Sequence, residues 1–387
     1  MIDGLQMPPS QNSSPWGPKL RVLDLRLDPD CRTTCSEIKT TCPFCFQSCI
    51  CSQRSILNGD KAQHSVRCLR RVRSETEPRS SVEPMKLLVE LSLDDTSRTR
   101  QFLSFLKSKV DQSSGSLHLC CRELQIVKIS AHKSFLRLLD LGCTDHLEVN
   151  EARLNEVTTL LARMIHLDRL TLSKISSKSC KGRNFRTFLT HLRRMDNLQE
   201  LSLSFFYLSG QLHRLLRVLP PQMDTLCLSF CGLSDRDITA LSLSPQARHL
   251  TLLNLSNNDM SWDSSESFQV LLETASGTLQ YLELNNCLIT DSTLSTLIPI
   301  LSRCTHLRVL SFSFNPITMP VLTTLLHHLT ALMELKLVIY PVPLHCYEHW
   351  NLHDGLDHGK CAEVQAQLKA MLQAVQRNDM HWTIRYK

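Results

Sequence analysis

The chain has 387 residues, a mass of 44.2 kDa, 42% hydrophobic residues, 17 cysteines and a formal net charge of +6. Its 11 glycines include no pair two or five positions apart, which excludes dinucleotide-binding fingerprints and P-loops. The 43 basic and 37 acidic residues are spread along the whole chain, whereas a nucleic-acid-binding protein concentrates its basic residues on one face.

The N-terminal part of the chain, up to position 84, is predicted to hold one repeat strand and little other regular structure. Residues 1–18 are rich in proline and polar residues, which is typical of a disordered segment. Within residues 19–84, Lys19–Arg26 alternates apolar and polar positions and predicts a strand, and a cysteine-rich insertion or loop follows it. The N-terminus has no basic stretch followed by an apolar one, so we expect no signal peptide, mostly reduced thiols and a cytoplasmic or nuclear protein.

Four residues of this loop, Cys42, Cys45, His64 and Cys68, are of the types that bind zinc. The spacing from the second to the third of them does not match the usual zinc-finger pattern, and no apolar run surrounds them. We therefore predict a cysteine-rich loop with no bound metal, and no cofactor for the chain. A zinc-binding or nucleic-acid-binding module over residues 28–73, which include a cluster of arginines, is the alternative.

The phrase L-x-x-L-x-L, with one Met and one Phe substitution, recurs seven times at nearly regular intervals. The copies begin at Leu167, Leu198, Met223, Leu250, Leu279, Leu307 and Leu332, and weaker copies occupy Leu20–Leu25, Leu88–Leu93 and Leu136–Leu141. This recurrence predicts a leucine-rich-repeat solenoid over residues 85–340, because one coil cannot bury its own leucines and must stack on the next. The expected fold is an α/β horseshoe with parallel strands on the concave face and helices on the convex face.

The residue pattern of each coil also predicts where the chain bends and where the helix of that coil lies. Three residues after the last strand leucine, several coils place Cys or Asn, whose side chain we expect to turn inward and pair backbone groups at the bend. Apolar spacing predicts helices over Arg98–Lys109, Ser264–Ser276, Asp291–Arg303 and Ala362–Gln376. Pro299 is expected to kink or split the third helix. The fourth, within the C-terminal residues 341–387, is expected to follow a loop and cap the array.

Strand positions between the buried leucines are expected to line the concave face, where solenoids usually bind their partners. Two neighbouring columns of these positions combine small polar residues with phenylalanine and asparagine. They are Ser204, Ser229, Ser256, Asn285 and Ser313 in the first column, and Phe205, Phe230, Asn257, Asn286 and Phe314 in the second. Such side chains suit a peptide or protein rather than a phosphate group, so we predict a protein partner on this face. The alternative is that the phenylalanines pack only on one another or on a loop.

Several phrases resemble the PRAME family of leucine-rich-repeat proteins. They are Lys19–Leu25, Leu117–Leu124, Ser209–Leu216, Leu297–Cys304 and Phe314–Met319. The resemblance implies a non-enzymatic adaptor that acts as a substrate receptor of cullin-2 ubiquitin ligases through elongin. It also implies roles in transcriptional repression, cell proliferation and the negative regulation of apoptosis and differentiation.

One part of the family pattern differs in this sequence. In the family, a helical N-terminal segment with the elongin and cullin box precedes the Lys19–Leu25 phrase, and here the proline-rich segment 1–18 stands in its place. Ser116, Leu117 and Cys121 match part of an elongin box, but Gln125 stands at an apolar position of that box. An interaction scaffold without ligase coupling is therefore the alternative function. No apolar run approaches the length of about 18 residues that a membrane span needs, so we expect no membrane partner.

Overall fold

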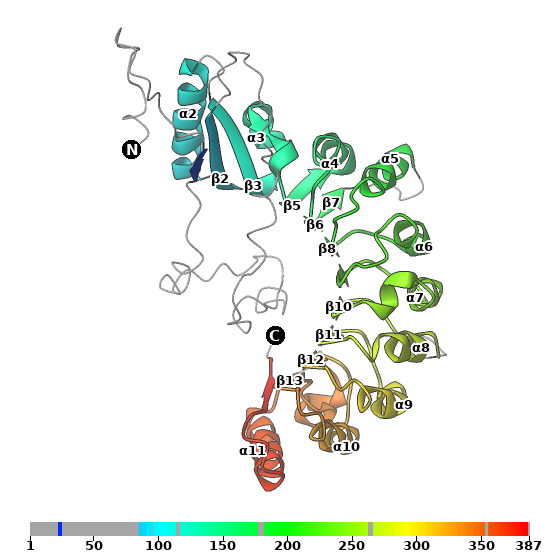
Figure 1. Ribbon diagram of the computed structural model, residues 1–387. Helices are drawn as coiled ribbons and strands as arrows, with labels where there is room; N and C mark the ends of the chain where they lie inside the picture. The colour runs from blue at the N-terminus through cyan, green and yellow to red at the C-terminus, as the bar shows by residue number, and fades with distance from the viewer. Residues whose placement is uncertain are drawn as a thin grey trace.

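The computed structural model describes residues 22–24, 85–94, 96–113, 117–176, 182–261, 266–352 and 355–385. Figure 1 shows the described strands along the inner side of an open arc and helices α3 to α10 along its outer side. These strands form a 14-stranded sheet in which each pair of neighbours is parallel. The structure confirms the predicted α/β leucine-rich-repeat horseshoe.

Twelve strands follow one another across the sheet in chain order, and two short strands lie beside this path. The twelve are β1 (Val22–Asp24), β2 (Met85–Leu93), β3 (Leu117–Lys128), β5 (His146–Arg153), β6 (Arg169–Ser173), β8 (Glu200–Ser204), β9 (Thr225–Ser229), β10 (Leu252–Asn254), β11 (Tyr281–Glu283), β12 (Val309–Ser311), β13 (Leu337–Tyr340) and β14 (His381–Ile384). The short strands are β4 (Leu139–Asp140), which pairs with β3, and β7 (Ile175–Ser176), which pairs with β5.

Helices connect the strands on the outer side of the arc. They are α2 (Ser97–Gln112), α3 (Ile129–Leu136), α4 (Leu154–Leu161), α5 (Arg183–Leu192), α6 (Leu212–Leu216), α7 (Asp235–Ser242), α8 (Glu266–Ala275), α9 (Asp291–Leu301), α10 (Met319–Leu329) and α11 (His358–Ala374). All four predicted helices are present, as α2, α8, α9 and α11. α9 is not split: it runs from Asp291 to Leu301 with Pro299 inside it. Because Pro299 lies two residues before the end, its missing N–H removes only one backbone hydrogen bond from the last turn.

The leucine phrases set the register of the sheet. The middle leucines of the first six copies pair with one another from coil to coil, and each is 1% exposed or less. Each such side chain contributes about 1.5–3 kcal/mol, and the contributions accumulate along one continuous core. That core extends into the C-terminal cap, where α11 buries Cys361, Val364 and Leu368.

Two predicted copies of the phrase are wrong. In the last coil, Val309 pairs with Leu337, so the core positions are Leu335, Val338 and Tyr340 instead of a phrase beginning at Leu332. The run of apolar residues there fits both registers, and the sequence pattern chose the one with more leucines.

The weak copy at Leu136–Leu141 also fails. Leu136 ends α3, and β4 is only two residues long. The coil's main strand is β5, in which Leu147 and Val149 face the core. The sequence pattern did not reveal the copy of the phrase that β5 carries, because Thr144 stands in place of its first leucine. This threonine is buried, and its hydroxyl donates to the carbonyl of Cys121.

Inward-turning asparagines, Asn258 and Asn315, complete two of the bends, as predicted. The side-chain amide of Asn258 donates to the carbonyls of Leu228 (2.7 Å) and Leu255 (2.8 Å). Its Oδ1 accepts from the backbone amides of Cys231 (3.1 Å) and Leu233 (3.2 Å). One side chain therefore satisfies four buried backbone groups in two coils, each of which would cost about 1–3 kcal/mol if left unpaired.

Cysteine occupies the same position in the alternate coils, as Cys231 and Cys287. The backbone amide of Cys287 donates to Oδ1 of Asn315 in the following coil, at 3.0 Å. Each asparagine thus serves its own coil and the one before it. The cysteine needs only a small volume, and its thiol lies 3.4 Å from a carbonyl of the preceding coil.

Candidate functional site

After each of six strands, β6 and β8 to β12, the chain passes through a residue in the left-handed backbone region. These residues, here called the rim ladder, are Lys174, Phe205, Phe230, Asn257, Asn286 and Phe314, with φ between 48° and 61°. The backbone amide of most of them donates to a carbonyl of the next coil, for example from Phe205 to Ser229 at 3.2 Å and from Asn286 to Ser313 at 2.8 Å. The repeat geometry therefore fixes this conformation, whichever side chain occupies it.

Two phenylalanines of the rim ladder form an exposed stacked pair. The ring centroids of Phe205 and Phe230 are 4.3 Å apart with 10° between their planes, and each residue is 40% exposed. The ammonium group of Lys174 lies 6.0 Å from the Phe205 ring centroid, so the pair also carries a cation at its edge. The alternative to partner binding, that the phenylalanines pack on one another, is met in part: the two rings stack, yet about two fifths of each residue remains open.

The next two coils carry asparagine at the same position. The side-chain amide of Asn286 donates to Oδ1 of Asn257 at 3.0 Å. Asparagine is also among the residues that best tolerate a positive φ, whereas the left-handed conformation strains a phenylalanine. Because asparagine meets the backbone requirement in these coils, the fold does not demand an aromatic residue at Phe205 and Phe230.

Four residues predicted to be on the open concave surface are buried: Ser256, Asn285, Ser313 and Phe314, at 6% exposure or less. Oδ1 of Asn285 accepts from the Ser311 hydroxyl (2.7 Å) and the Ser313 amide (2.9 Å). The Ser256 hydroxyl accepts from the Asn285 amide at 3.1 Å. These polar side chains pair groups of neighbouring coils, so they hold the sheet together rather than face a partner. Ser204 and Ser229, earlier in the column, are half-buried.

The concave face is charged along its N-terminal strands. One row of the sheet runs through Glu123, His146, Arg169 and Glu200, each one position before a core leucine and so on the opposite face of its strand. The Arg169 guanidinium contacts the Glu123 carboxylate at 3.2 Å. Burial lowers the pKa of His146 to about 4, and the charge of Arg169 acts in the same direction. The imidazole is therefore neutral at pH 7.

Further along the sheet, the same face becomes apolar. Cys227, Leu252, Tyr281 and Val309 form a cluster of buried side chains separate from the main core, and Leu337 packs against it. Phe205 follows β8, the last strand of the charged row, and Phe230 follows β9, the first strand of the apolar cluster. The pair therefore marks the boundary of two chemically different halves.

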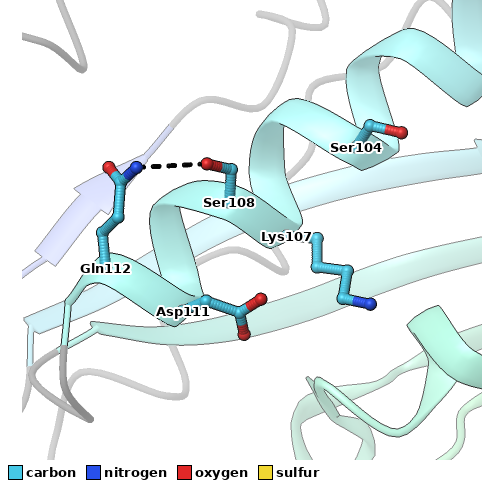
Figure 2. A pocket seen from close by; sticks show the side chains of 5 residues that line it. All are labelled: Ser104, Lys107, Ser108, Asp111 and Gln112. Carbon is cyan, nitrogen blue, oxygen red and sulfur yellow. Dashed lines mark hydrogen bonds between the residues drawn. The ribbon is translucent and has the colours of Figure 1, made fainter.

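Hollows elsewhere on the described surface offer little chemistry. Figure 2 shows a shallow hollow whose lining comes from helix α2 alone. Its lining residues are Ser104, Lys107, Ser108, Asp111 and Gln112. A second hollow of about 360 Å³ lies between α11 and β14 and is lined in part by Tyr340, Leu368 and Trp382. Neither brings a nucleophile, a base and an orienting group together.

Among the helices of the described residues, none has both the length and the apolar character that a membrane span needs.

The predicted alternative metal ligands Cys42, Cys45, His64 and Cys68 lie outside the described residues. Among the described cysteines, Cys120 and Cys143 form a disulfide, and seven others are buried and form no disulfide. Burial raises the pKa of the Cys287 thiol to about 12 and that of Cys304 to about 11, so these thiols are neutral packing groups at pH 7.

Comparison with known proteins agrees with this architecture. Residues 85–384 match the PRAME C-terminal domain. The chain belongs to the PRAME family. It is 34% identical over 328 residues to human leucine-rich repeat-containing protein 14 and 34% identical over 298 residues to human PRAME family member 7. The alignments cover 79% and 74% of this chain but 66% and 62% of those relatives, so the chain spans just under two thirds of their length.

One solved structure aligns with part of this chain. A chain in the crystal structure of the yeast Rad7 and Elc1 complex aligns with a TM-score of 0.43 and 16% sequence identity. The alignment covers 66% of this PRAME-family chain and 69% of that chain.

Sequence reasoning missed two residues at the rim of this PRAME-family chain. Lys174 precedes the aromatic pair in the rim ladder, and the repeat period alone could have placed it there. Tyr207 is 70% exposed, and a Cβ at Gly232 would lie 2.7 Å from its Cε2. With a φ of 59°, Gly232 is thus required both by its backbone conformation and by the adjacent ring. No sequence signal indicates that contact, because it joins two coils.

Proposed function

We propose that this chain is a non-enzymatic protein-interaction adaptor that holds a protein partner on its concave face and rim. Membership of the PRAME family and the horseshoe fold support this function. The rim around Phe205 and Phe230 is the proposed point of contact, with Ser204, Ser229, Asn257 and Asn286 beside it.

The single observation that carries the proposal is the exposed stacked pair of Phe205 and Phe230. Aromatic residues with a large open face are enriched at the centres of protein interfaces. The backbone at these positions accepts asparagine in the neighbouring coils, so folding alone does not explain the aromatic side chains. The charged row that ends beside the pair, from Glu123 to Glu200, suits a partner segment that also carries charged side chains.

Site-specific photo-crosslinking tests this proposal. A photoreactive phenylalanine analogue replaces Phe205 or Phe230 in the full chain, and a third variant carries it at Val270. This control residue on α8 is on the convex side and is 39% exposed, which matches the phenylalanines. We expect the same partner to crosslink at positions 205 and 230 but not at 270. Equal crosslinking at all three positions would contradict the proposal.

We further propose that the adaptor delivers its partner to a cullin-2 ubiquitin ligase through elongin, in the cytoplasm or nucleus. Roles in transcriptional repression, proliferation and the negative regulation of apoptosis and differentiation would follow from the proteins it delivers. Family membership supports this step. The partial elongin box does not, because Leu117–Lys128 is strand β3 and Cys121 is fully buried in it.

Co-purification separates ligase coupling from simple adaptor function. The tagged full chain is immunoprecipitated, and elongin C and cullin-2 are quantified beside the partner that crosslinks at Phe230. Recovery of all three proteins supports ligase coupling. Recovery of the partner without elongin C and cullin-2 indicates an interaction scaffold without ligase coupling.

A further inference from the structure

Three potential metal ligands meet where the N-terminal coil closes. Cys120 lies on β3 directly opposite Asp140 on β4, and Cys143 ends the 3₁₀ turn η4 (Leu141–Cys143) that follows β4. One ligand atom of each residue lies within 4.8 Å of the other two. No other group of three or more Cys, His, Asp and Glu side chains within the described residues has its ligand atoms this close together.

The turn orients two of these ligands toward the same point. Oδ1 of Asp140 accepts a hydrogen bond from the backbone amide of Gly142 at 3.1 Å, which fixes the carboxylate. Its Oδ2 is then left 3.4 Å from Sγ of Cys143. Ligands three residues apart on a tight turn are a common feature of structural zinc sites. The hydrogen bond to Gly142 is the kind of supporting contact that holds a metal ligand in place.

The distances suit a tetrahedral ion. Zinc–sulfur bonds of about 2.3 Å and zinc–oxygen bonds of about 2.0–2.2 Å place a sulfur and an oxygen ligand about 3.5 Å apart. The Cys143–Asp140 separation is 3.4 Å, and the Cα atoms of Cys120 and Cys143 are 5.7 Å apart. Asp140 is exposed and Cys143 is half-buried, so an ion can enter from solvent and a water molecule can complete the coordination.

We propose that Cys120, Asp140 and Cys143 form a zinc site when their disulfide is reduced. A dithiol or phosphine reductant supplies two electrons, and with two protons from water the disulfide becomes two thiols. Zinc then displaces both protons and is held by two thiolates and one carboxylate. Either cross-link, disulfide or zinc, joins the same two positions, which are 23 apart in sequence, so the N-terminal coil stays closed in oxidising and reducing conditions alike.

Residue-resolved alkylation tests the site in the full chain. The protein is reduced with a phosphine, treated with iodoacetamide with or without Zn²⁺, and analysed by peptide mass spectrometry. Because the metal-bound sulfur is no longer a free nucleophile, we expect Zn²⁺ to slow alkylation of Cys143 by about tenfold or more. Reading each cysteine separately keeps zinc bound elsewhere in the chain from affecting the result. Buried Cys304 serves as the folding control, because it should stay unmodified in both arms while the chain is folded.

Two variants decide which residues hold the ion. Asp140→Asn keeps an oxygen for the Gly142 amide but removes the charge, and it is expected to lose most of the protection of Cys143. Asp357→Asn is the matched control, because Asp357 is another exposed carboxylate that caps a helix, accepting from the Lys360 amide at 3.1 Å. An alkylation rate of Cys143 that is unchanged by Zn²⁺ in the wild-type chain overturns the proposal. Undiminished protection in Asp140→Asn overturns the role of Asp140.

Discussion

Phenylalanine occupies the same position of the repeat near the middle of the rim ladder and near its C-terminal end, with opposite results. Phe205, Phe230 and Phe314 all follow a strand with φ between 53° and 60°. The first two are 40% exposed and stack on each other, whereas Phe314 is 6% exposed. The comparison shows that the repeat position dictates the backbone but not the surroundings of the side chain. Only the exposed pair is available to a partner.

The largest predicted effect concerns the buried member of this comparison. Phe314→Ala should lower the free energy of unfolding by about 3–5 kcal/mol, because a buried ring is replaced by a cavity. Phe230→Ala should cost only about 1 kcal/mol, mainly the loss of stacking. Urea unfolding followed by circular dichroism measures both. Equal losses for the two variants would show that the difference in exposure has no energetic meaning.

A second prediction compares two residues at the inward-turning position of the bend. Asn315→Ala should cost about 4 kcal/mol, because the amides of Cys287 and Ile289 and the carbonyls of Leu284 and Phe312 lose their partner. Cys287→Ala removes a weak thiol contact and little volume, so it should cost about 1 kcal/mol. The same unfolding measurement ranks them. A loss from Cys287→Ala as large as that from Asn315→Ala would contradict the role assigned to the asparagines.

The third prediction concerns the charged half of the concave face. Unfolded His146 binds a proton near its usual pKa of about 6.5, but folded His146 does so only near pH 4. Its contribution to stability is therefore complete above about pH 6.5 and is lost as the pH falls toward 4. We expect this loss to be about 1–2 kcal/mol, below the full linkage value because the residue is only partly buried. His146→Gln should flatten the unfolding free energy over this range, and an unchanged slope would show that His146 is not its source.

The sequence predicts the repeat far better than it predicts the surface. Leucine spacing places six strands in the correct register, because only one alignment buries all of their leucines. The register fails at Leu332, where a nearly continuous apolar run permits two alignments. It also fails at Thr144, a polar residue in a core position. Aligning the equivalent positions of successive coils identifies Phe205 and Phe230. It cannot distinguish them from Phe314, because the burial of each ring depends on contacts between coils.

The fourth prediction has the smallest effect on stability and the largest on function. Removing both exposed rings in a Phe205→Ala, Phe230→Ala double variant should change the free energy of unfolding by about 1 kcal/mol, since mainly the stacking energy is lost. Loss of a central aromatic contact from an interface, by contrast, commonly costs about 2 kcal/mol or more of binding energy. A loss of stability as large as that expected for Phe314→Ala would show that the pair serves the fold.

The most direct measurement of the central claim is partner capture by this double variant. The full-length double variant, the wild-type chain and a Val270→Ala control are immobilised at equal amounts, and the partner that crosslinks at Phe230 is quantified on each. The account predicts that the double variant loses most of the captured partner while the control matches the wild type. Unchanged capture by a folded double variant would contradict the claim that the aromatic pair holds the partner.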